Sequence, residues 1–310
     1  MLPDVQMMNT GFPPINIDQV GVENIKSVLS IQMRNGSTQE CFANFSAYCS
    51  LKKSIKGINM SRIGRAIMDL TKDRNISYLN LAPFVHKLME YHENDNSHIV
   101  AEFNYIVTQK TPISNLDTPK PLYVKLISYY RNGILKNYLV VRSTEMSLCP
   151  CSKEMSLLKY NLTNEEKNIL HELPKSLLDK IYASGYGAHN QKSVIEVCVE
   201  LSETPTYIED ILEIIEASAS SPTYSILKRE DEKYVTELSY CGGIWNGNFA
   251  KIKGGPRFVE DISRYAAQSL HMLLDSGKIR DYKVSVRNQE SIHCEDIQAM
   301  ATITAQKELL

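Results

Sequence analysis

The chain has little of what marks the secreted, membrane-spanning and nucleic-acid-binding classes of protein. Its seven cysteines are odd in number and scattered over 310 residues, unlike the dense pairs of a disulfide scaffold. No apolar run approaches the roughly 20 residues that span a bilayer. Residues 1–6 lack a signal-peptide pattern, and a formal net charge of −2 suggests no basic surface. We therefore expect a cytoplasmic protein with no nucleic-acid and no membrane partner.

Several common motifs of enzymes are also missing. The sequence has no Walker-type loop, no Rossmann glycine pattern, no nucleophile elbow and no His-Glu-x-x-His helix. Hydrophobic residues nonetheless make up 43% of the chain, enough to fill the core of one large domain or of two modest ones. The chemistry must therefore come from another arrangement of residues.

Alternating apolar and polar residues predict strands. In 41–51 every odd position is apolar or small, whereas the even ones include Asn44, Ser46 and Ser50. The same period appears in 193–201. Further strand signals lie at 25–33, 99–107, 122–130, 136–142 and 282–287. Cysteines within such runs, namely Cys41, Cys49 and Cys198, are expected to be small buried hydrophobes.

Helical spacing of apolar residues predicts four helices, over 60–70, 81–91, 208–215 and 257–275. Strands and helices are clustered along the chain instead of alternating, which favours an α+β fold with antiparallel sheets. Two similar halves are expected, residues 1–142 and 143–310, with an insertion at about 157–184. The charged stretch 227–237 has the composition of a solvated loop.

The most unusual stretch is Cys149-Pro150-Cys151. In an extended backbone the two thiols would share one face, and thiolates are good ligands for a borderline metal such as zinc. Pro150 disfavours a helix through Cys149. The alternative is that both are unremarkable thiols.

Three further positions are candidates for a site. His189 precedes a strand, where a neutral imidazole can bind a metal, although a lone histidine is more often a surface residue. Glu290 and His293 pair a carboxylate with an imidazole, which suits acid–base chemistry if the strand ends near Asn288; an exposed strand end is the alternative. Glu237, next to apolar residues, could accept hydrogen bonds from N1–H and the 2-amino group of guanine.

Taken together, these segments resemble the type IB GTP cyclohydrolases over most of the chain. Each motif alone is short, but their order and approximate spacing make the combination specific. The segments that carry the resemblance are Leu2–Gln6, Val20–Val22, Lys56-Gly57, Met60–Arg62, Leu148–Glu154, Gly187–Gln191, Leu227–Glu237, Phe258–Asp261 and Glu290–His293.

The resemblance implies a tunnelling fold, with two tandem ββααββ-like halves in each subunit. It also implies a homotetramer whose active sites lie at subunit interfaces. The expected reaction converts GTP and water into 7,8-dihydroneopterin triphosphate and formate, the first step of tetrahydrofolate and pterin biosynthesis.

Residue roles follow from the same resemblance. Cys149 and His189 correspond to ligands of a divalent metal, Zn²⁺ or Mn²⁺, with Fe²⁺ as a third option. Cys151 corresponds to a second active-site thiol, and Glu290 and His293 to catalytic groups. Three residues, Glu237, Lys192 and Arg62, correspond to substrate-binding positions.

The sequence departs from the family pattern at one expected metal ligand. A glutamate is expected where Pro222 stands, and proline cannot bind a metal. Glu216 and Glu213 are the nearest carboxylates; otherwise fewer protein groups hold the metal, or the chain binds it weakly or not at all. The alternative functions are therefore a divergent purine cyclohydrolase of a specialised pathway and a catalytically impaired purine-binding paralogue.

Overall fold

The computed structural model describes residues 11–72, 81–92, 96–155, 162–178, 188–246 and 251–305. Within these ranges one antiparallel sheet runs in the order β1-β2-β3-β4-β5-β6-β9-β10, and β7 and β8 form a separate hairpin. The strands are β1 (Ile17–Gln32), β2 (Thr38–Leu51), β3 (Asn96–Lys110), β4 (Asp117–Arg131), β5 (Ile134–Leu148), β6 (Asn190–Leu201), β7 (Gly243–Asn246), β8 (Lys251–Gly254), β9 (Ile279–Gln289) and β10 (Gln298–Thr304). The helices are α1 (Met60–Lys72), α2 (Ala82–His92), α3 (Pro150–Met155), α4 (Asn164–Glu172), α6 (Ile208–Ser218), α7 (Arg229–Cys241) and α8 (Val259–Asp275).

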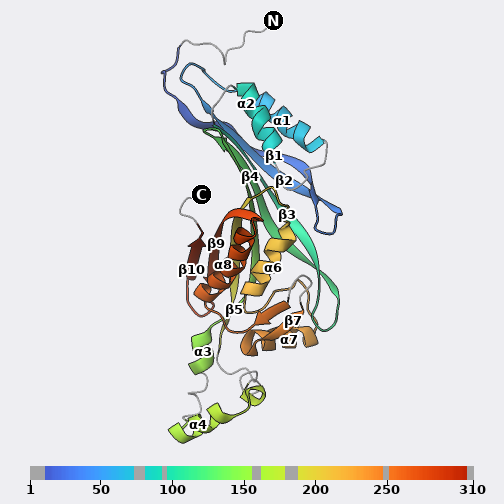
Figure 1. Cartoon of the computed structure of the whole chain (residues 1–310), viewed down its shortest axis with the longest axis vertical. Helices are drawn as coiled ribbons and strands as arrows, with labels where there is room; N and C mark the ends of the chain where they lie inside the picture. The colour runs from blue at the N-terminus through green and yellow to red at the C-terminus, as the bar shows by residue number, and fades with distance from the viewer. Residues whose placement is uncertain are drawn as a thin grey trace.

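Helices cover one face of the long sheet (Figure 1). Alternate residues of β3, including Ile99, Ala101 and Phe103, are buried on that face. Helices α1 and α2 pack on the part of the sheet nearest the N-terminus, and α6 and α8 pack on the part formed by β5, β6, β9 and β10. Because one large connected cluster of buried side chains runs through both parts, they share a continuous core.

The predicted α+β class with an antiparallel sheet is confirmed. Every predicted strand and helix lies within or overlaps an observed one, whereas β7, β8 and β10 have no counterpart in the prediction. The first four strands and first two helices follow the order ββααββ. The predicted division at 142/143 falls within β5, and the two halves stay a prediction.

The prediction of a solvated loop over 227–237 is wrong, because α7 covers most of this stretch. Its charges sit where a helix tolerates them: acidic residues occupy the first turn, near the positive end of the helix dipole. The Asp231 carboxylate also accepts the Lys228 backbone N–H and caps the helix. Val235 and Leu238 supply a buried face.

The other expectations have mixed outcomes. Cys41 and Cys49 are buried, and Cys198 is partly exposed; burial raises the pKa of Cys41 to about 11 and that of Cys198 to about 12. The insertion at 157–184 contains α4, and residues 156–161 and 179–187 lie outside the described part of the chain. The motif at 2–6 also lies outside it. No helix in the described ranges is long and apolar enough to cross a membrane.

A buried ion cluster joins β4, β5 and α6. The Lys120 ammonium contacts the Glu145 carboxylate at 2.6 Å and the Glu216 carboxylate at 2.7 Å, and at most 6% of any of the three side chains is exposed. Gln109 of β3 donates a further hydrogen bond to Glu216 at 2.6 Å. Burial lowers the pKa of Lys120, but the two carboxylates outweigh it and hold that pKa above its usual value.

We predict that Lys120→Met destabilises the fold by about 3–5 kcal/mol, because it leaves two buried carboxylates without a counter-ion. Urea unfolding measures the loss. Lys110→Met is the matched control: Lys110 of β3 contacts Asp117 of β4 at 2.9 Å but is exposed, so its loss should cost about 1 kcal/mol or less. Equal losses in the two variants would contradict the prediction.

Candidate active site

Strand ends from distant parts of the sequence meet at one end of the sheet. Leu148 at the end of β5 pairs with Asn190 at the start of β6, and Ser193 of β6 pairs with Asn288 near the end of β9. Gln289 in turn pairs with Gln298, the first residue of β10. Residues just beyond these positions are therefore neighbours in space, although up to about 150 positions separate them in sequence.

Cys149 and His189 lie side by side at this end. The Cys149 backbone N–H donates to the His189 carbonyl over 3.3 Å. The His189 Nδ1 lies 3.2 Å from the Ser291 hydroxyl, which follows β9. One ring nitrogen is thus engaged by Ser291 and the other is left to meet a ligand. The expected position of His189 at a strand mouth is confirmed.

Glu290 and His293 line one cavity of about 510 Å³, which Lys192 also lines. Because β9 ends at Gln289, the chain turns and both side chains reach the same space, as predicted. The Gln191 side chain donates to the Glu290 carboxylate over 3.2 Å and orients it. The cavity is lined by Glu145, Met146, Asn190, Gln191, Lys192, Thr223, Gln289, Glu290, Ser291, His293, Asp296 and Ile297.

The expected extended geometry of Cys149-Pro150-Cys151 is wrong beyond Cys149. Pro150 begins α3, where the missing proline N–H costs nothing and the fixed φ suits a first helical residue. The Lys153 N–H donates to the Cys149 carbonyl over 3.2 Å. Cys151 is therefore helical and exposed, whereas Cys149 is half-buried. The two thiols do not share a strand face.

Helix α7 is tied to this end of the sheet through Tyr240. Its hydroxyl donates to the Ala188 carbonyl over 2.6 Å, next to His189, and its own carbonyl accepts from the Lys153 ammonium over 2.6 Å. Glu237 lies one turn earlier on α7. Its side chain is 43% exposed and lies 3.7 Å from the Lys233 ammonium, outside the lining of the cavity described above.

The segment that contains Pro222 runs beside β5. Leu148 N–H donates to the Ser220 hydroxyl over 3.1 Å, and Thr223 N–H donates to the Glu145 carboxylate over 2.9 Å. Thr223 lines the cavity. The structure thus brings this segment to the site, with a buried proline at the position where the resemblance expects a ligand.

The donor set falls short of the expected metal centre. Catalytic zinc sites usually have three protein ligands. Among the residues that the structure describes, no three His, Cys, Asp or Glu side chains are grouped to hold a metal. Glu216 is bound to Lys120 in the core, and Glu213 lies 2.8 Å from Arg34. Of the expected ligands only Cys149 and His189 lie at this end of the sheet, and the described residues do not fit a three-ligand site.

Arg62 does not join the other residues within one chain. It lies on α1, where its guanidinium is 3.5 Å from the Tyr91 carbonyl. Figure 1 shows α1 at one end of the long axis and α3, which follows Cys149, towards the other.

Sequence reasoning missed the residues that hold the site together. Arg257 donates its backbone N–H to the Leu148 carbonyl over 3.1 Å, and its guanidinium donates to the Ala217 and Ala219 carbonyls over 2.7 and 2.9 Å. It thereby clamps the segment before Pro222 against β5. Ser291 and Gln191 lie within the motifs noted above, so their proximity to His189 and Glu290 was the available signal.

The N-terminal turn of α7 is fixed by Asp231. Its carboxylate accepts the N–H groups of Ile113 and Ser114 at 2.9 Å each, and the Ser114 hydroxyl as well. Burial raises the pKa of this carboxyl, but the hydrogen bonds from Ser114, Ile113 and Lys228 outweigh it and lower the pKa to about 2. The helix that carries Glu237 and Tyr240 is thus anchored to the turn between β3 and β4.

Comparisons with known proteins agree on one family. The family profile described as "Type I GTP cyclohydrolase folE2" matches residues 2–299. The chain is similar to "GTP cyclohydrolase FolE2" of Magnetococcus marinus, with 30% identity over 90% of this chain and 88% of that protein. It is 33% identical to the protein of the same name from Geotalea uraniireducens, over 90% of this chain and 85% of that protein.

Among solved structures, the crystal structure of uricase from Arthrobacter globiformis matches with a TM-score of 0.53 and 8% identity, over 96% of both chains. At that identity the likeness concerns the fold alone. It supports the tunnelling fold that the sequence resemblance implies.

We predict that Asp231→Asn lowers the free energy of unfolding by about 2 kcal/mol near neutral pH, because hydrogen bonds to a buried charge are lost. In the unmodified chain this contribution is present above about pH 4 and disappears as the pH falls towards 2, since the folded-state pKa is depressed. Denaturant unfolding at several pH values measures it. The control is Glu230→Gln, an exposed acid of the same turn; a similar loss there would contradict the role of Asp231.

Proposed function

This chain belongs to the type I GTP cyclohydrolase FolE2 family, and from that premise we propose that it converts GTP and water into 7,8-dihydroneopterin triphosphate and formate, the first step of tetrahydrofolate and pterin biosynthesis. One observation carries the proposal. Cys149, His189, Glu290 and His293, which come from three separate segments, meet at one end of the sheet beside a cavity.

Two residues can serve the two ends of a nucleotide, Glu237 of α7, which lies outside the cavity lining, and Lys192 in the cavity wall. We assign the guanine to Glu237, whose carboxylate can accept from N1–H and the 2-amino group, and which Asp231 and Tyr240 keep near the site. Lys192 lies near the start of strand β6 and is exposed at the cavity wall. Its ammonium is assigned to the phosphates. Arg62 of a second copy would add a further cation.

Proton transfer is assigned to Glu290 and His293. Opening the imidazole ring of guanine and releasing formate both require protons to move between water and ring nitrogens. An imidazole side chain suits that task near neutral pH, and His293 is exposed at the cavity, where substrate can reach it. Glu290, oriented by Gln191, is fixed beside it and can accept the proton of the attacking water.

A divalent metal enters this proposal only at Cys149 and His189. Zn²⁺, Mn²⁺ or Fe²⁺ would supply a Lewis acid there when bound. With two ligands from the chain, we propose weak binding, and no step above depends on it. Cys151, exposed on α3, is assigned to the rim of the site instead of to the ligand set.

We also propose a homotetramer with active sites between subunits. Two observations support this assembly: Arg62 lies away from the other site residues, and β1 and β10 end the sheet order, each with one edge open for another strand. The balanced charge supports a cytoplasmic location without a nucleic-acid or membrane partner.

The second candidate function is a purine-binding paralogue with impaired turnover. It is favoured by Pro222, which stands at the site in place of an expected ligand. A divergent cyclohydrolase that acts on another purine would use the same cavity. It would differ from a GTP cyclohydrolase only in its substrate.

We predict that the purified chain releases formate from GTP in the presence of Zn²⁺, Mn²⁺ or Fe²⁺, and that Glu290→Gln and His293→Asn each reduce the rate at least about 100-fold through lost proton transfer. His271→Asn, an exposed histidine of α8, is the control and should keep full activity. Nucleotide binding without formate under all three metals would favour the impaired paralogue. Formate from another purine nucleotide, but not from GTP, would favour the divergent enzyme.

We predict that Zn²⁺ binding is weak enough for a chelator to remove the metal, and that Cys149→Ala and His189→Ala each abolish what remains, because only two ligands hold it. Metal analysis after equilibrium dialysis measures the bound ion independently of turnover. Cys294→Ala and His171→Ala, both exposed, are matched controls. The assignment would be refuted if one metal ion per chain stays bound after treatment with the chelator and the Cys149→Ala variant binds the same amount.

A further inference from the structure

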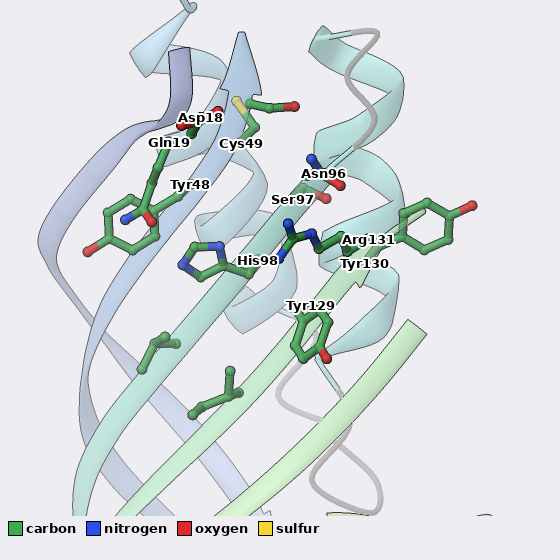
Figure 2. Close-up of a pocket in the computed structure, with 13 residues that line it drawn as sticks. Asp18, Gln19, Tyr48, Cys49, Asn96, Ser97, His98, Tyr129, Tyr130 and Arg131 are labelled. Carbon is green, nitrogen blue, oxygen red and sulfur yellow. The ribbon is translucent and has the colours of Figure 1, made fainter. Parts of the chain in front are cut away.

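A second cavity, of about 700 Å³, shares no lining residue with the cavity of the candidate active site. Figure 2 shows the residues that line it. It is formed by β1, β2, β3 and β4 on the face of the sheet opposite α1 and α2. The Ser97 hydroxyl marks the covered face, because it donates to the Val85 carbonyl of α2. The neighbouring residue on β3, His98, points to the other face and into the cavity. The volume is within the range of small-molecule sites.

Aromatic rings form a stripe across three neighbouring strands. Tyr48 pairs with His98 between β2 and β3, and His98 pairs with Tyr129 between β3 and β4, so all three side chains share one face. The Tyr48 and His98 rings are stacked, with centroids 4.6 Å apart and planes 27° apart. Burial lowers the pKa of His98, which keeps the imidazole neutral. The stripe therefore offers flat uncharged surfaces for stacking.

A cation and an unsatisfied hydrogen-bond acceptor lie on β3 and β4, two residues from His98 and Tyr129. Asn96 pairs with Arg131 between β3 and β4, on the same face as His98 and Tyr129, and Figure 2 shows both beside His98. The Asn96 Oδ1 is buried, and none of the residues that the structure describes forms a hydrogen bond with it. Such a buried acceptor costs free energy until it meets a donor. No ion pair joins Arg131 to a carboxylate among the residues that the structure describes.

We propose that this cavity is a second binding site, and that its ligand is a phosphorylated compound with a flat nitrogen heterocycle. The heterocycle stacks on Tyr48, His98 and Tyr129, and a ring or amino N–H satisfies Asn96. The phosphate binds the Arg131 guanidinium, which matches phosphate oxygens in a two-pronged contact. Figure 1 places this part of the sheet beside α2, towards the opposite end of the chain from α3.

Two compounds of the proposed reaction share this chemistry, the substrate GTP and the product pterin triphosphate. The choice between them rests on the proposed function, whereas the site itself rests on the residues above. Binding of substrate or product at this cavity would let the concentration of that compound act on the assembly at a distance from the reacting atoms.

The test counts binding sites on the full chain by calorimetry, with GTP, neopterin triphosphate, ATP and inorganic triphosphate as separate probes. It uses the Glu237→Gln background, in which the candidate active site is weakened. We expect one remaining site per chain for GTP, for the pterin or for both. Arg131→Gln and Tyr48→Leu should each weaken that site about tenfold, the scale of one lost charge-assisted or stacking contact. Arg264→Gln, an exposed arginine of α8, is the matched control.

The outcomes separate the two proposals. Loss of all binding in the Glu237→Gln chain, or an Arg131→Gln variant that binds as the Arg264→Gln chain does, would overturn the second site. Tighter binding of inorganic triphosphate than of any heterocycle would also overturn it, since the aromatic stripe would then contribute nothing. Absence of formate from GTP, together with binding that depends on Arg131, would reject the proposed function and leave the second site standing.

Discussion

A single buried ammonium ties three elements of this chain together. Lys120 projects from β4 towards Glu145 of β5 and Glu216 of α6. Burying three charges is costly unless each is matched, and here the match requires all three elements at once. The position of α6 over the sheet is thus set by an electrostatic condition as well as by its apolar face.

The same cluster reaches the candidate active site. The Glu145 carboxylate that binds Lys120 also accepts the Thr223 N–H, and Thr223 forms part of the cavity wall. Glu216 lies in the last turn of α6, and the segment that contains Pro222 follows this helix. Because Glu216 is committed to Lys120, the carboxylate nearest to Pro222 along the chain serves the core. The weak metal centre proposed here follows from that division of roles.

Much of the fold could be predicted because burial leaves a periodic trace in the sequence. The strand at 41–51 and the helix at 257–275 were found from period alone. The shared pocket of Glu290 and His293 was predicted from a strand end, and the family resemblance placed His189 in the same site. Other features could not be predicted.

Helix α7 depends on a contact between Asp231 and Ser114, which are remote from each other in sequence.

At Pro150 the sequence is compatible with either a turn or the first residue of a helix. The direction of the Cys151 side chain relative to Cys149 therefore could not be predicted. The aromatic stripe depends on register between β2, β3 and β4, and single-strand periodicity shows which face a residue takes but not which residue lies opposite it. Family resemblance supplied residue roles, yet it could not show that Arg62 and Cys149 lie towards opposite ends of one chain.

Tyr240 has a consequence for how this chain tolerates change in length. Through its hydroxyl and its carbonyl it holds both stems of the excursion between β5 and β6, at Ala188 and at Lys153. The entropy of closing a loop grows only with the logarithm of its length. With both stems fixed to one residue of α7, residues can be gained or lost between them at little energetic cost. The number of residues between Cys149 and His189 can therefore change while the distance between them in space stays the same.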